Sequence, residues 1–429
     1  SSDGQLLFLM EMVSKMKPLN MSLFGSRIAS VHNGSSLFTG DAGGGESNIR
    51  RYIIENDLLD AIIQMPNNLF YNTGITTYIW MLTNNKPAQR KGKVQLIDAS
   101  QRYEKLRKNL GSKNCEFKPH HIREIIEAYN TMEPLERAAD EDLASQVFDN
   151  SDFGYYKVTI ERPKRLKAQF SEERLASLRF DKKLLEPMQY AWETYGDRVY
   201  TELKALEKEL TDWCEAQELD LNTKQTKALV SKETWQTQLD LLQTAQTLMA
   251  AIGTEEYNDF NVFRKEVDAE LKASKTALSA SQKKQILDAV SWYASDAAKV
   301  AKGIKKLKRD ALNELLERWK CREEDLPNYG LYATGKPGEY LEYETESDLR
   351  DYENIPLKEG IYTYFLREVK PQVAEAWINI ETTKIGYEIS FNKYFYRHKP
   401  LRSIEEVSAD ILQLERESEG LILEILNLN

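Results

Sequence analysis

The stretch from Arg27 to Leu82 has the sequence RIASVHNGSSLFTGDAGGGESNIRRYIIENDLLDAIIQMPNNLFYNTGITTYIWML. Three apolar runs in it end at residues typical of turns, and a helical segment separates the first two. Strands that alternate with a helix in this way predict a parallel sheet that binds its ligand at the carboxyl ends of the strands. We therefore expect an α/β fold and the back half of a nucleotide-type sheet. The runs are Arg27–Val31, Leu59–Gln64 and Thr76–Leu82.

The 429-residue chain is long enough for about two to three domains. Its texture predicts a sheet region over residues 1–170, a helical region over 171–320 and an assembly region over 321–429. Within the sheet region we expect helices over 5–17 and 120–131 and a strand over 94–98. Another helix should start after Ser231 and stop at Gly253. A further helical face is predicted by Val300, Ile304, Leu307, Ala311 and Leu315.

The net charge of −10 argues against a protein that binds DNA mainly through its own phosphate contacts, because such contacts need clustered Lys and Arg. A grip on DNA should therefore come from a partner or from local patches. Two basic patches are present, and each fits an ordinary solvated surface equally well. The first is Arg90, Lys91, Lys93, Lys105, Arg107, Lys108 and Lys113, and the second is Arg162, Lys164, Arg165 and Lys167.

The sequence has neither an apolar run long enough to cross a membrane nor a basic-then-apolar leader, so we expect a soluble, cytoplasmic protein. Cys115, Cys214 and Cys321 lie too far apart for a zinc site or a disulfide framework, and we expect reduced thiols. The His120–His121 pair has no nearby Cys or second His pair. We therefore expect this pair in a surface loop, and no metal site.

Several motifs occur in order at both ends of the chain. They are Asn33–Glu46, Asn48–Glu55, Met65–Trp80, Val147–Gly154 with Glu161–Pro163, Tyr329–Leu357 and Lys384–Ile389. This set resembles the modification (methylation) subunit of type I restriction-modification systems, a family of DNA adenine-N6 methyltransferases that use S-adenosylmethionine. The resemblance implies the C-terminal half of a Rossmann-like methyltransferase sheet, followed by a mostly α-helical C-terminal domain.

Two features of that family are missing from this sequence. Members hold the cofactor in a Gly-rich turn after their first strand, and the target amino group with an Asn-Pro-Pro-aromatic tetrapeptide after the fourth. The sequence has no Asn-Pro-Pro, and its glycine cluster, Gly40–Gly45, follows a later strand. We therefore interpret the chain as a C-terminal portion without catalytic residues, which alone neither binds S-adenosylmethionine nor methylates DNA, and whose strand Arg27–Val31 is a bare edge. The alternative is a non-catalytic helical assembly module that binds the specificity subunit.

Methylation of an adenine in a duplex requires the base to leave the stack and to lie against an aromatic face. The resemblance assigns that face to Phe70, and the alternative is a core phenylalanine beneath the sheet edge. Asn72 and Thr73 are weaker candidates for lining the same pocket, because Asn and Gly also serve ordinary turns.

The glycine cluster lacks the Gly-Lys-Ser/Thr ending of a phosphate cradle, so we do not expect it to bind ATP. One interpretation is a mobile loop over the substrate cleft, with Arg50 or Arg51 reaching a DNA phosphate; the other is plain flexibility. In the second basic patch, Lys164 and Arg165 are the DNA-proximal candidates.

The last helix is predicted to begin at a capping box formed by Ser403 and Glu406. Its apolar residues then alternate by three and four, a heptad seam broken by Ser418. Such a seam either packs against its own domain or docks on a partner helix. The resemblance supplies the partner: in this family two modification subunits flank one specificity subunit, with a restriction (translocase) subunit and double-stranded DNA as further partners. The expected partner-binding residues are Ile404, Val407, Ile411, Leu414, Leu421, Ile425 and Leu428.

Overall fold

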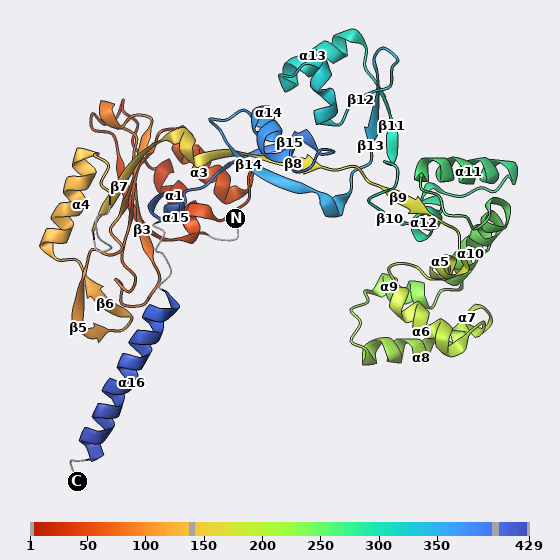
Figure 1. Cartoon of the computed structure of the whole chain (residues 1–429), viewed down its shortest axis with the longest axis horizontal. Coiled ribbons are helices and arrows are strands. Elements are labelled where there is room, and N and C mark those ends of the chain that lie inside the picture. Colours follow the sequence, from red (N-terminus) through yellow and green to blue (C-terminus); the bar gives the residue numbers. More distant parts are fainter. Residues whose placement is uncertain (1–3, 137–141, 397–402, 427–429) are drawn as a thin grey trace. The chain divides into compact units, whose positions relative to one another are not determined.

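The computed structural model describes residues 4–136, 142–396 and 403–426, and the chain divides into two compact units (Figure 1). The first unit consists of Ser1–Tyr156, Pro356–Lys358 and Lys384–Asn429, and the second of Lys157–Ile355 and Glu359–Thr383. Each unit therefore combines segments that are distant in the sequence, whereas the sequence texture predicts three consecutive regions.

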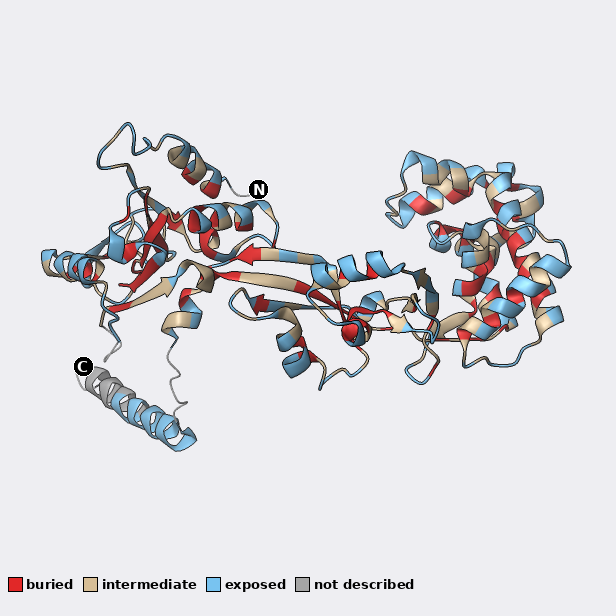
Figure 2. Ribbon diagram, turned by 90° about the horizontal axis from the view of Figure 1, so that it is seen from above, coloured by how far each residue is buried: buried red, intermediate tan, exposed pale blue. Residues whose placement is uncertain are grey.

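The first unit is built around a five-stranded sheet with the strand order β1-β3-β2-β4-β7. Strand β3 pairs antiparallel with both β1 and β2, and β4 pairs parallel with β2 and antiparallel with β7. The carboxyl ends of β1, β2 and β4 therefore lie at one edge of the sheet, and β2 and β4 are almost wholly buried (Figure 2). The strands are β1 (Arg27–Asn33), β2 (Leu59–Gln64), β3 (Thr77–Thr83), β4 (Lys93–Asp98) and β7 (Ala144–Asp149).

The prediction of a parallel sheet is wrong for the third apolar run, which forms the antiparallel strand β3 between β1 and β2. The connection from β2 to β3 contains no helix. Parallel neighbours need a long crossover that is usually helical, whereas a loop without one returns the chain antiparallel. Strand β1 ends the sheet and, among the described strands, pairs with β3 alone, so the predicted bare edge is confirmed.

Helices and a hairpin surround the sheet, and the predicted helices near residues 5–17 and 120–131 and strand near 94–98 are confirmed. The shorter elements of this unit are α1 (Gln5–Ser14), α2 (Ser35–Phe38), α3 (Gly45–Glu55), η1 (Ala88–Arg90), β5 (Glu104–Leu110), β6 (Lys113–Glu116), α4 (Pro119–Thr131), η2 (Asn150–Phe153) and α15 (Phe391–Phe395). Within the described ranges, no helix combines the length and the apolar character that a membrane span requires.

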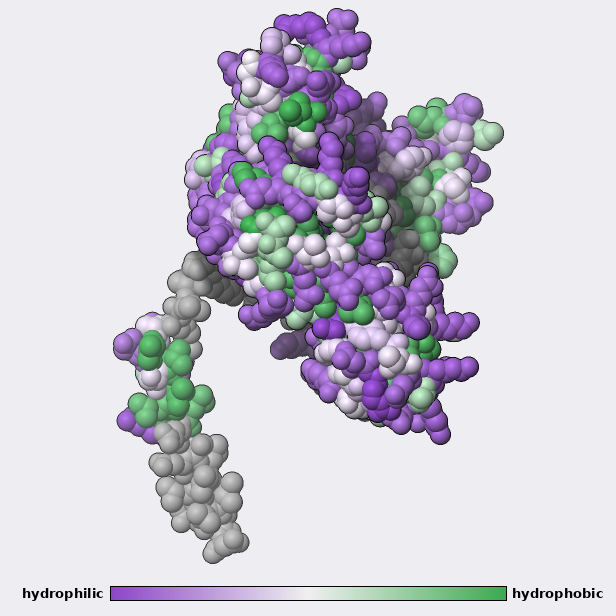
Figure 3. Space-filling model, turned by 90° about the vertical axis from the view of Figure 1, so that its right-hand side faces the viewer, coloured by the Kyte–Doolittle hydropathy of each residue, from purple (hydrophilic) through white to green (hydrophobic). Residues whose placement is uncertain are grey.

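The last helix, α16 (Ile404–Leu426), begins at the predicted capping box. The backbone N–H of Glu406 donates to Ser403 Oγ at 3.1 Å, and the N–H of Ser403 donates to Glu406 Oε2 at 3.2 Å. The described part of the seam lies at the surface, where Ile411 is 58% exposed, and Figure 3 shows hydrophobic residues along it. Leu428 and the side chains of Ser418, Leu421 and Ile425 lie outside the described residues.

The second unit is mostly helical between residues 172 and 289. Its longest helix, α10 (Lys232–Ile252), starts after Ser231 and stops at Gly253, whose φ of +97° suits glycine, as the sequence predicts. The other helices are α5 (Glu172–Ala176), η3 (Ser177–Arg179), α6 (Leu185–Tyr195), α7 (Arg198–Thr201), α8 (Leu203–Ala216), α9 (Thr223–Leu229), α11 (Phe260–Ala273), α12 (Ala280–Ala289), α13 (Arg309–Trp319), η4 (Glu323–Tyr329), η5 (Ser347–Leu349), α14 (Ile361–Tyr364) and the π-helix η6 (Phe365–Val369).

Short strands complete this unit, and the chain passes between the two units within three of them. The two-stranded sheet pairs β9 (Leu166–Ala168) with β10 (Ser291–Tyr293), and a three-stranded sheet has the order β11 (Ala301–Lys306), β13 (Glu339–Tyr343), β12 (Tyr332–Ala333). The strands shared by the units are β14 (Asp351–Pro356), β8 (Gly154–Glu161) and β15 (Trp377–Tyr387), in that order.

The helical face predicted from Val300 to Leu315 is wrong in its first half. Residues Ala301–Lys306 form β11, which pairs antiparallel with β13, and the helix begins only at Arg309. Ile304, a member of the predicted face, is 55% exposed. Apolar spacing over so short a stretch fits either structure, and the pairing with β13 decides between them.

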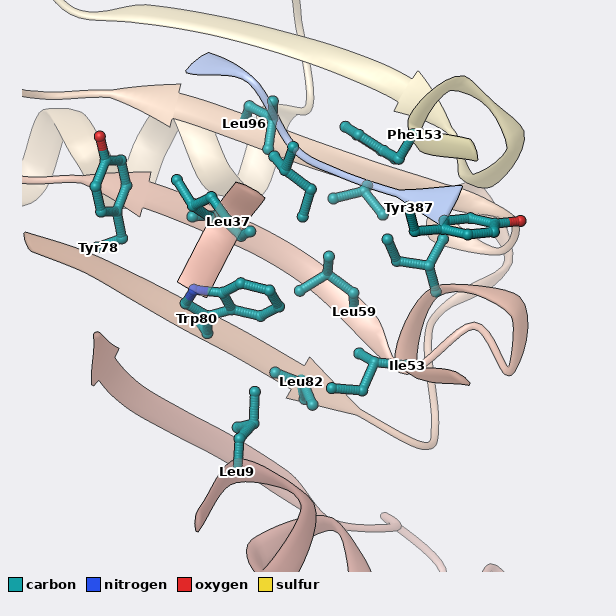
Figure 4. Packing of buried hydrophobic residues seen from close by; sticks show 14 of the residues in the cluster. Leu9, Leu37, Ile53, Leu59, Tyr78, Trp80, Leu82, Leu96, Phe153 and Tyr387 are labelled. Atoms are coloured by element: carbon teal, nitrogen blue, oxygen red, sulfur yellow. The ribbon is translucent and has the colours of Figure 1, made fainter. Parts of the chain in front are cut away.

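The core of the first unit has two sides, because alternate strand residues point to opposite faces of the sheet. On one side Ile62 and Leu96 pack with Trp80, helix α3 and the segment that follows β15 (Figure 4). On the other side Ile63 and Ile97 pack with α4. Residues near both ends of the chain therefore share one hydrophobic core.

Arg50 joins these distant segments from the centre of the unit. Its side chain is fully buried and donates from Nε to the carbonyl of Tyr387 at 2.7 Å, across 337 positions of sequence. The other guanidinium nitrogens donate to the carbonyls of Ser36 at 3.1 Å and Thr39 at 2.6 Å. Burial lowers the pKa of Arg50 to about 10, so the side chain stays charged at neutral pH and needs all three acceptors.

We predict that Arg50→Lys lowers the free energy of unfolding of the first unit by about 2 to 4 kcal/mol, since an ammonium cannot span three carbonyls held by a planar fork. Native-state hydrogen exchange of the α3 amides, followed by mass spectrometry, measures this decrease.

The matched control is Arg51→Lys, at a neighbouring position whose side chain is 39% exposed and pairs with Glu55. It should change the same free energy by less than about 0.5 kcal/mol. Equal effects of the two variants would show that the three carbonyls do not depend on Arg50.

Candidate nucleic-acid interface

The carboxyl edge of the sheet carries a loop that contains the predicted base-stacking residue. This edge loop, residues 65–76, connects β2 to β3, and its first residue, Met65, donates its backbone N–H to the carbonyl of Thr77 at 2.9 Å. Both ends of the loop are therefore fixed in the sheet ladder. The part between them projects beyond the strand ends, which is where α/β sheets bind ligands.

A second element, the hairpin of β5 and β6, holds the edge loop. We call residues 104–116 the basic hairpin. The N–H groups of Ser112 and Asn114 donate to the carbonyls of Tyr71 at 2.9 Å and Asn68 at 3.0 Å. The Asn68 side chain donates back to the carbonyl of Ser112 at 3.0 Å. These bonds join residues of two surface segments that are far apart in the sequence, 44 positions in the case of Asn68 and Ser112.

Gly111 makes this close approach feasible. Its φ is +65°, in the left-handed region, and a Cβ added to it would lie 2.5 Å from the carbonyl oxygen of Tyr71. Gly111 and Ser112 also form the two-residue turn of the hairpin, where glycine at positive φ is favoured. The hairpin therefore packs on the edge loop backbone to backbone, which a larger residue would prevent.

Phe70 lies in the edge loop at a tight turn, with an isolated β-bridge to Thr73. It is half-buried and belongs to neither hydrophobic core of the first unit. Between Phe70 and Thr73, the side chain of Tyr71 is 63% exposed and Asn72 is exposed. The structure therefore brings the three predicted pocket residues together at one turn, and it adds Tyr71, whose exposed ring the sequence did not single out.

The basic hairpin carries four cations, one of which lies over the ring of Tyr71. Lys105, Arg107 and Lys108 are exposed on β5, and Lys113 lies 5.5 Å from the ring centre of Tyr71. None of the four forms an ion pair with any residue that the structure describes. Cations interleaved with exposed aromatic rings are typical of surfaces that bind nucleic acid.

The first basic patch is wrong as a single patch, because β4 separates its members. Lys91 precedes β4 and Lys93 is its first residue, whereas the basic hairpin follows the other end of that strand. Arg90 is buried and donates from Nε to Asp60 Oδ1 at 2.6 Å. The hydroxyl of Tyr129 donates to the same carboxylate, and burial together with this bond raises the pKa of Tyr129 to about 12. Arg90 therefore has a structural role.

Two other DNA-proximal candidates are also engaged inside the fold. Arg50 is fully buried against three carbonyls, so it does not reach a phosphate. Arg165 pairs with Glu375 at 2.6 Å and donates to the carbonyl of Ala297. Neither arginine is available to a phosphate, because its donors already bond to a carboxylate or to carbonyl groups. Arg51, on the surface beside Glu55, and Lys164, half-buried, stay candidates.

The glycine cluster between α2 and α3 is shaped by local hydrogen bonds. In the glycine cluster, the N–H of Gly44 donates to the carbonyl of Asp41 at 2.7 Å, and the Asn48 side chain donates to the carbonyl of Gly43 at 2.9 Å. These groups are used to start α3. The cluster therefore shapes the chain between α2 and α3.

The first part of the chain is similar to known proteins. Residues 1–165 match the family described as N-6 DNA Methylase. A 115-residue segment is 36% identical to the type I restriction enzyme MjaVII methylase subunit of Methanocaldococcus jannaschii, and it covers 26% of this chain and 18% of that protein. An 88-residue segment is 33% identical to the MpnII methylase subunit of Mycoplasma pneumoniae, covering 20% and 15%.

A solved structure, the methyltransferase subunit of a type I restriction-modification system from Streptococcus thermophilus, is 26% identical with a TM-score of 0.29, covering 35% of this chain and 28% of that one. The chain spans less than a fifth of the length of the curated relatives above. The resemblance seen in the motifs is confirmed: residues 1–165 match the N-6 DNA methylase family, and the chain is similar to methylase subunits of type I restriction enzymes.

Proposed function

We propose that this chain is part of the DNA adenine-N6 methyltransferase (modification) subunit of a type I restriction-modification complex. S-adenosylmethionine would donate the methyl group, and residues other than the glycine cluster would hold it. The observation that carries the proposal is the edge loop with Phe70, held by the basic hairpin at the carboxyl edge of the sheet. An aromatic turn held by a cationic hairpin suits a surface that binds an extruded base and the DNA strand around it.

Phe70 and its turn would receive the extruded adenine. A base that leaves the duplex loses its stacking partners, and an aromatic side chain replaces part of that interaction. Phe70 is half-buried and lies outside the two hydrophobic clusters of the first unit, so stacking on its exposed part would not require either cluster to open. Asn72 and Thr73, at the same turn, are the polar groups nearest in sequence for contacting the base.

The basic hairpin would bind the DNA backbone beside the extruded base. The chain carries a net charge of −10, so its surface as a whole repels DNA. A local group of unpaired cations is then the part that binds phosphates, and the sequence-specific contacts would come from the specificity subunit. The hydrogen bonds between the hairpin and the edge loop would keep phosphate contacts and base stacking in register.

A second function, assembly, is favoured by the exposed seam of α16. Apolar side chains in a heptad pattern at the surface bury area when a partner helix docks. We propose the specificity subunit as the partner, in a complex with a second modification subunit and a restriction subunit. Assembly and methylation are compatible functions of one subunit, and the non-catalytic module is the special case in which assembly alone remains.

We predict that Arg107→Gln with Lys108→Gln weakens binding of the chain to duplex DNA and reduces the slope of log K against log salt by about 0.9 for each phosphate that the variant no longer neutralises. Fluorescence anisotropy with a labelled duplex over a range of salt concentrations gives the slope. The matched control is Lys91→Gln with Lys93→Gln, two exposed cations before and at the start of β4. An equal change in both double variants would show that the basic hairpin does not bind the phosphates.

In a complete subunit, Phe70→Ala should weaken capture of the extruded base by about 1 to 3 kcal/mol. A 2-aminopurine at the target position reports base extrusion by its fluorescence, and calorimetry reports cofactor affinity, which should not change. Phe70→Trp keeps an aromatic face and should retain most of the capture. Loss of cofactor binding or of folding in Phe70→Ala would show that Phe70 supports the core.

For α16, Ile411→Glu should abolish co-purification with the specificity subunit, because a charge placed in the seam opposes burial. Ala409→Glu lies on the opposite side of the heptad and is the matched control that should leave the complex intact. Thermal melting of the chain should be nearly unchanged in both. A large fall in melting temperature for Ile411→Glu, with the complex preserved, would place the seam in the protein's own core.

A further inference from the structure

The sequence predicts the two adjacent histidines in a surface loop, and this prediction is wrong. His120 and His121 occupy the first turn of α4, which begins at Pro119, and His121 is buried. Their ring centres are 3.9 Å apart. Glu104, the first residue of β5, meets them from sixteen positions upstream, and the potential ligand atoms of the three residues all lie within 4.8 Å of one another.

The local structure fixes each of these groups. Glu104 stands opposite Glu116 in the ladder of the basic hairpin. The backbone N–H of Lys118 donates to His121 Nδ1 at 3.2 Å, so the lone pair of that nitrogen points at the amide. A metal ion bound at Nδ1 would take the place of this long hydrogen bond.

The carboxylates around the cluster differ in whether they are paired. They are Glu104, Glu116 and Glu124, and the nearby cations are Arg102, Lys113 and Lys118, so the charges balance before a metal ion binds. Glu124 is bound by Arg102 through two bonds of 2.7 and 2.8 Å, and Glu116 is bound by Lys118 at 2.6 Å. Glu104 is the carboxylate of this group that forms no ion pair with a described residue.

We propose that Glu104, His120 and His121 form a binding site for a divalent transition metal, with Zn²⁺ as the ion that fits best. Two imidazoles and one carboxylate are a known zinc ligand set and leave a fourth position for water. The imidazoles select against Mg²⁺ and Ca²⁺, which prefer oxygen ligands. The site is separate from the edge loop, and metal binding does not depend on the proposed action on DNA.

Metal binding at this site would tie the base of the basic hairpin to α4. Glu104 belongs to β5 and both histidines belong to α4, so one ion would add a link between the helix and the strand of the hairpin that does not run directly into it. The linked hairpin carries Lys105, Arg107 and Lys108. An occupied site should therefore slow opening of the hairpin.

The test is a calorimetric titration of the tag-free, full chain with ZnCl₂, and separately with MgCl₂. We expect one Zn²⁺ per chain and no Mg²⁺ binding. Glu104→Gln and His120→Asn should each weaken Zn²⁺ binding by at least about tenfold. The matched control, Glu127→Gln, removes one exposed carboxylate from the same helix and should have no effect.

Two further measurements identify the ligands and the consequence. Cobalt substitution should give the absorption of nitrogen and oxygen ligands without thiolate charge-transfer bands, and Zn²⁺ should slow hydrogen exchange in residues 104–116. Equal Zn²⁺ affinity in all variants, or thiolate bands that place a cysteine in the site, would overturn the proposal. Hairpin exchange that slows with Zn²⁺ while DNA affinity stays unaffected would support the site and count against the DNA role of the hairpin.

Discussion

The buried guanidinium of Arg50 is the interaction on which the first unit depends. A charge in a hydrophobic core is costly unless it is hydrogen-bonded, and Arg50 donates to three carbonyls in two segments, the farther of which lies 337 positions away in the sequence. Removal of either segment would leave the buried charge with fewer acceptors. This one side chain therefore explains why a segment after residue 384 closes the same core as α3 and the central strands.

With the sheet fixed, its carboxyl edge becomes a rigid support for two surface segments. The edge loop begins and ends in the ladder, and the basic hairpin is joined to it by backbone hydrogen bonds around Gly111. Rigid placement matters for the proposed function, because a base that leaves the duplex must meet its aromatic partner while nearby phosphates are held. In the proposed function, the acidic chain would contact DNA through a small cationic region, and sequence recognition would fall to the specificity subunit.

Several residues with the right chemistry in the sequence have other roles in the structure. Arg90 and Arg165 carry the same charge as Arg107, but their partners are Asp60 and Glu375, which the sequence does not place beside them. The apolar spacing from Val300 onward fits a helix, but strand β13 offers backbone partners that turn its first part into β11. In each case a distant partner overrides a local pattern.

Sequence alone determined the features that depend on near neighbours: the capping box at Ser403, the stop of α10 at Gly253, the edge position of β1 and the motifs shared with the methylase family. It also singled out Phe70 and its turn as candidates. Only the tertiary structure decided the direction of β3 and the burial of Arg50. It also decided that the cations of the basic hairpin form no ion pair with a described residue, and that Glu104 lies close to His120. The physical reason is the distance along the sequence between the interacting groups. Caps and turns are set by bonds within a few residues. Strand direction, ion pairing and ligand clusters require segments that only the folded chain brings together.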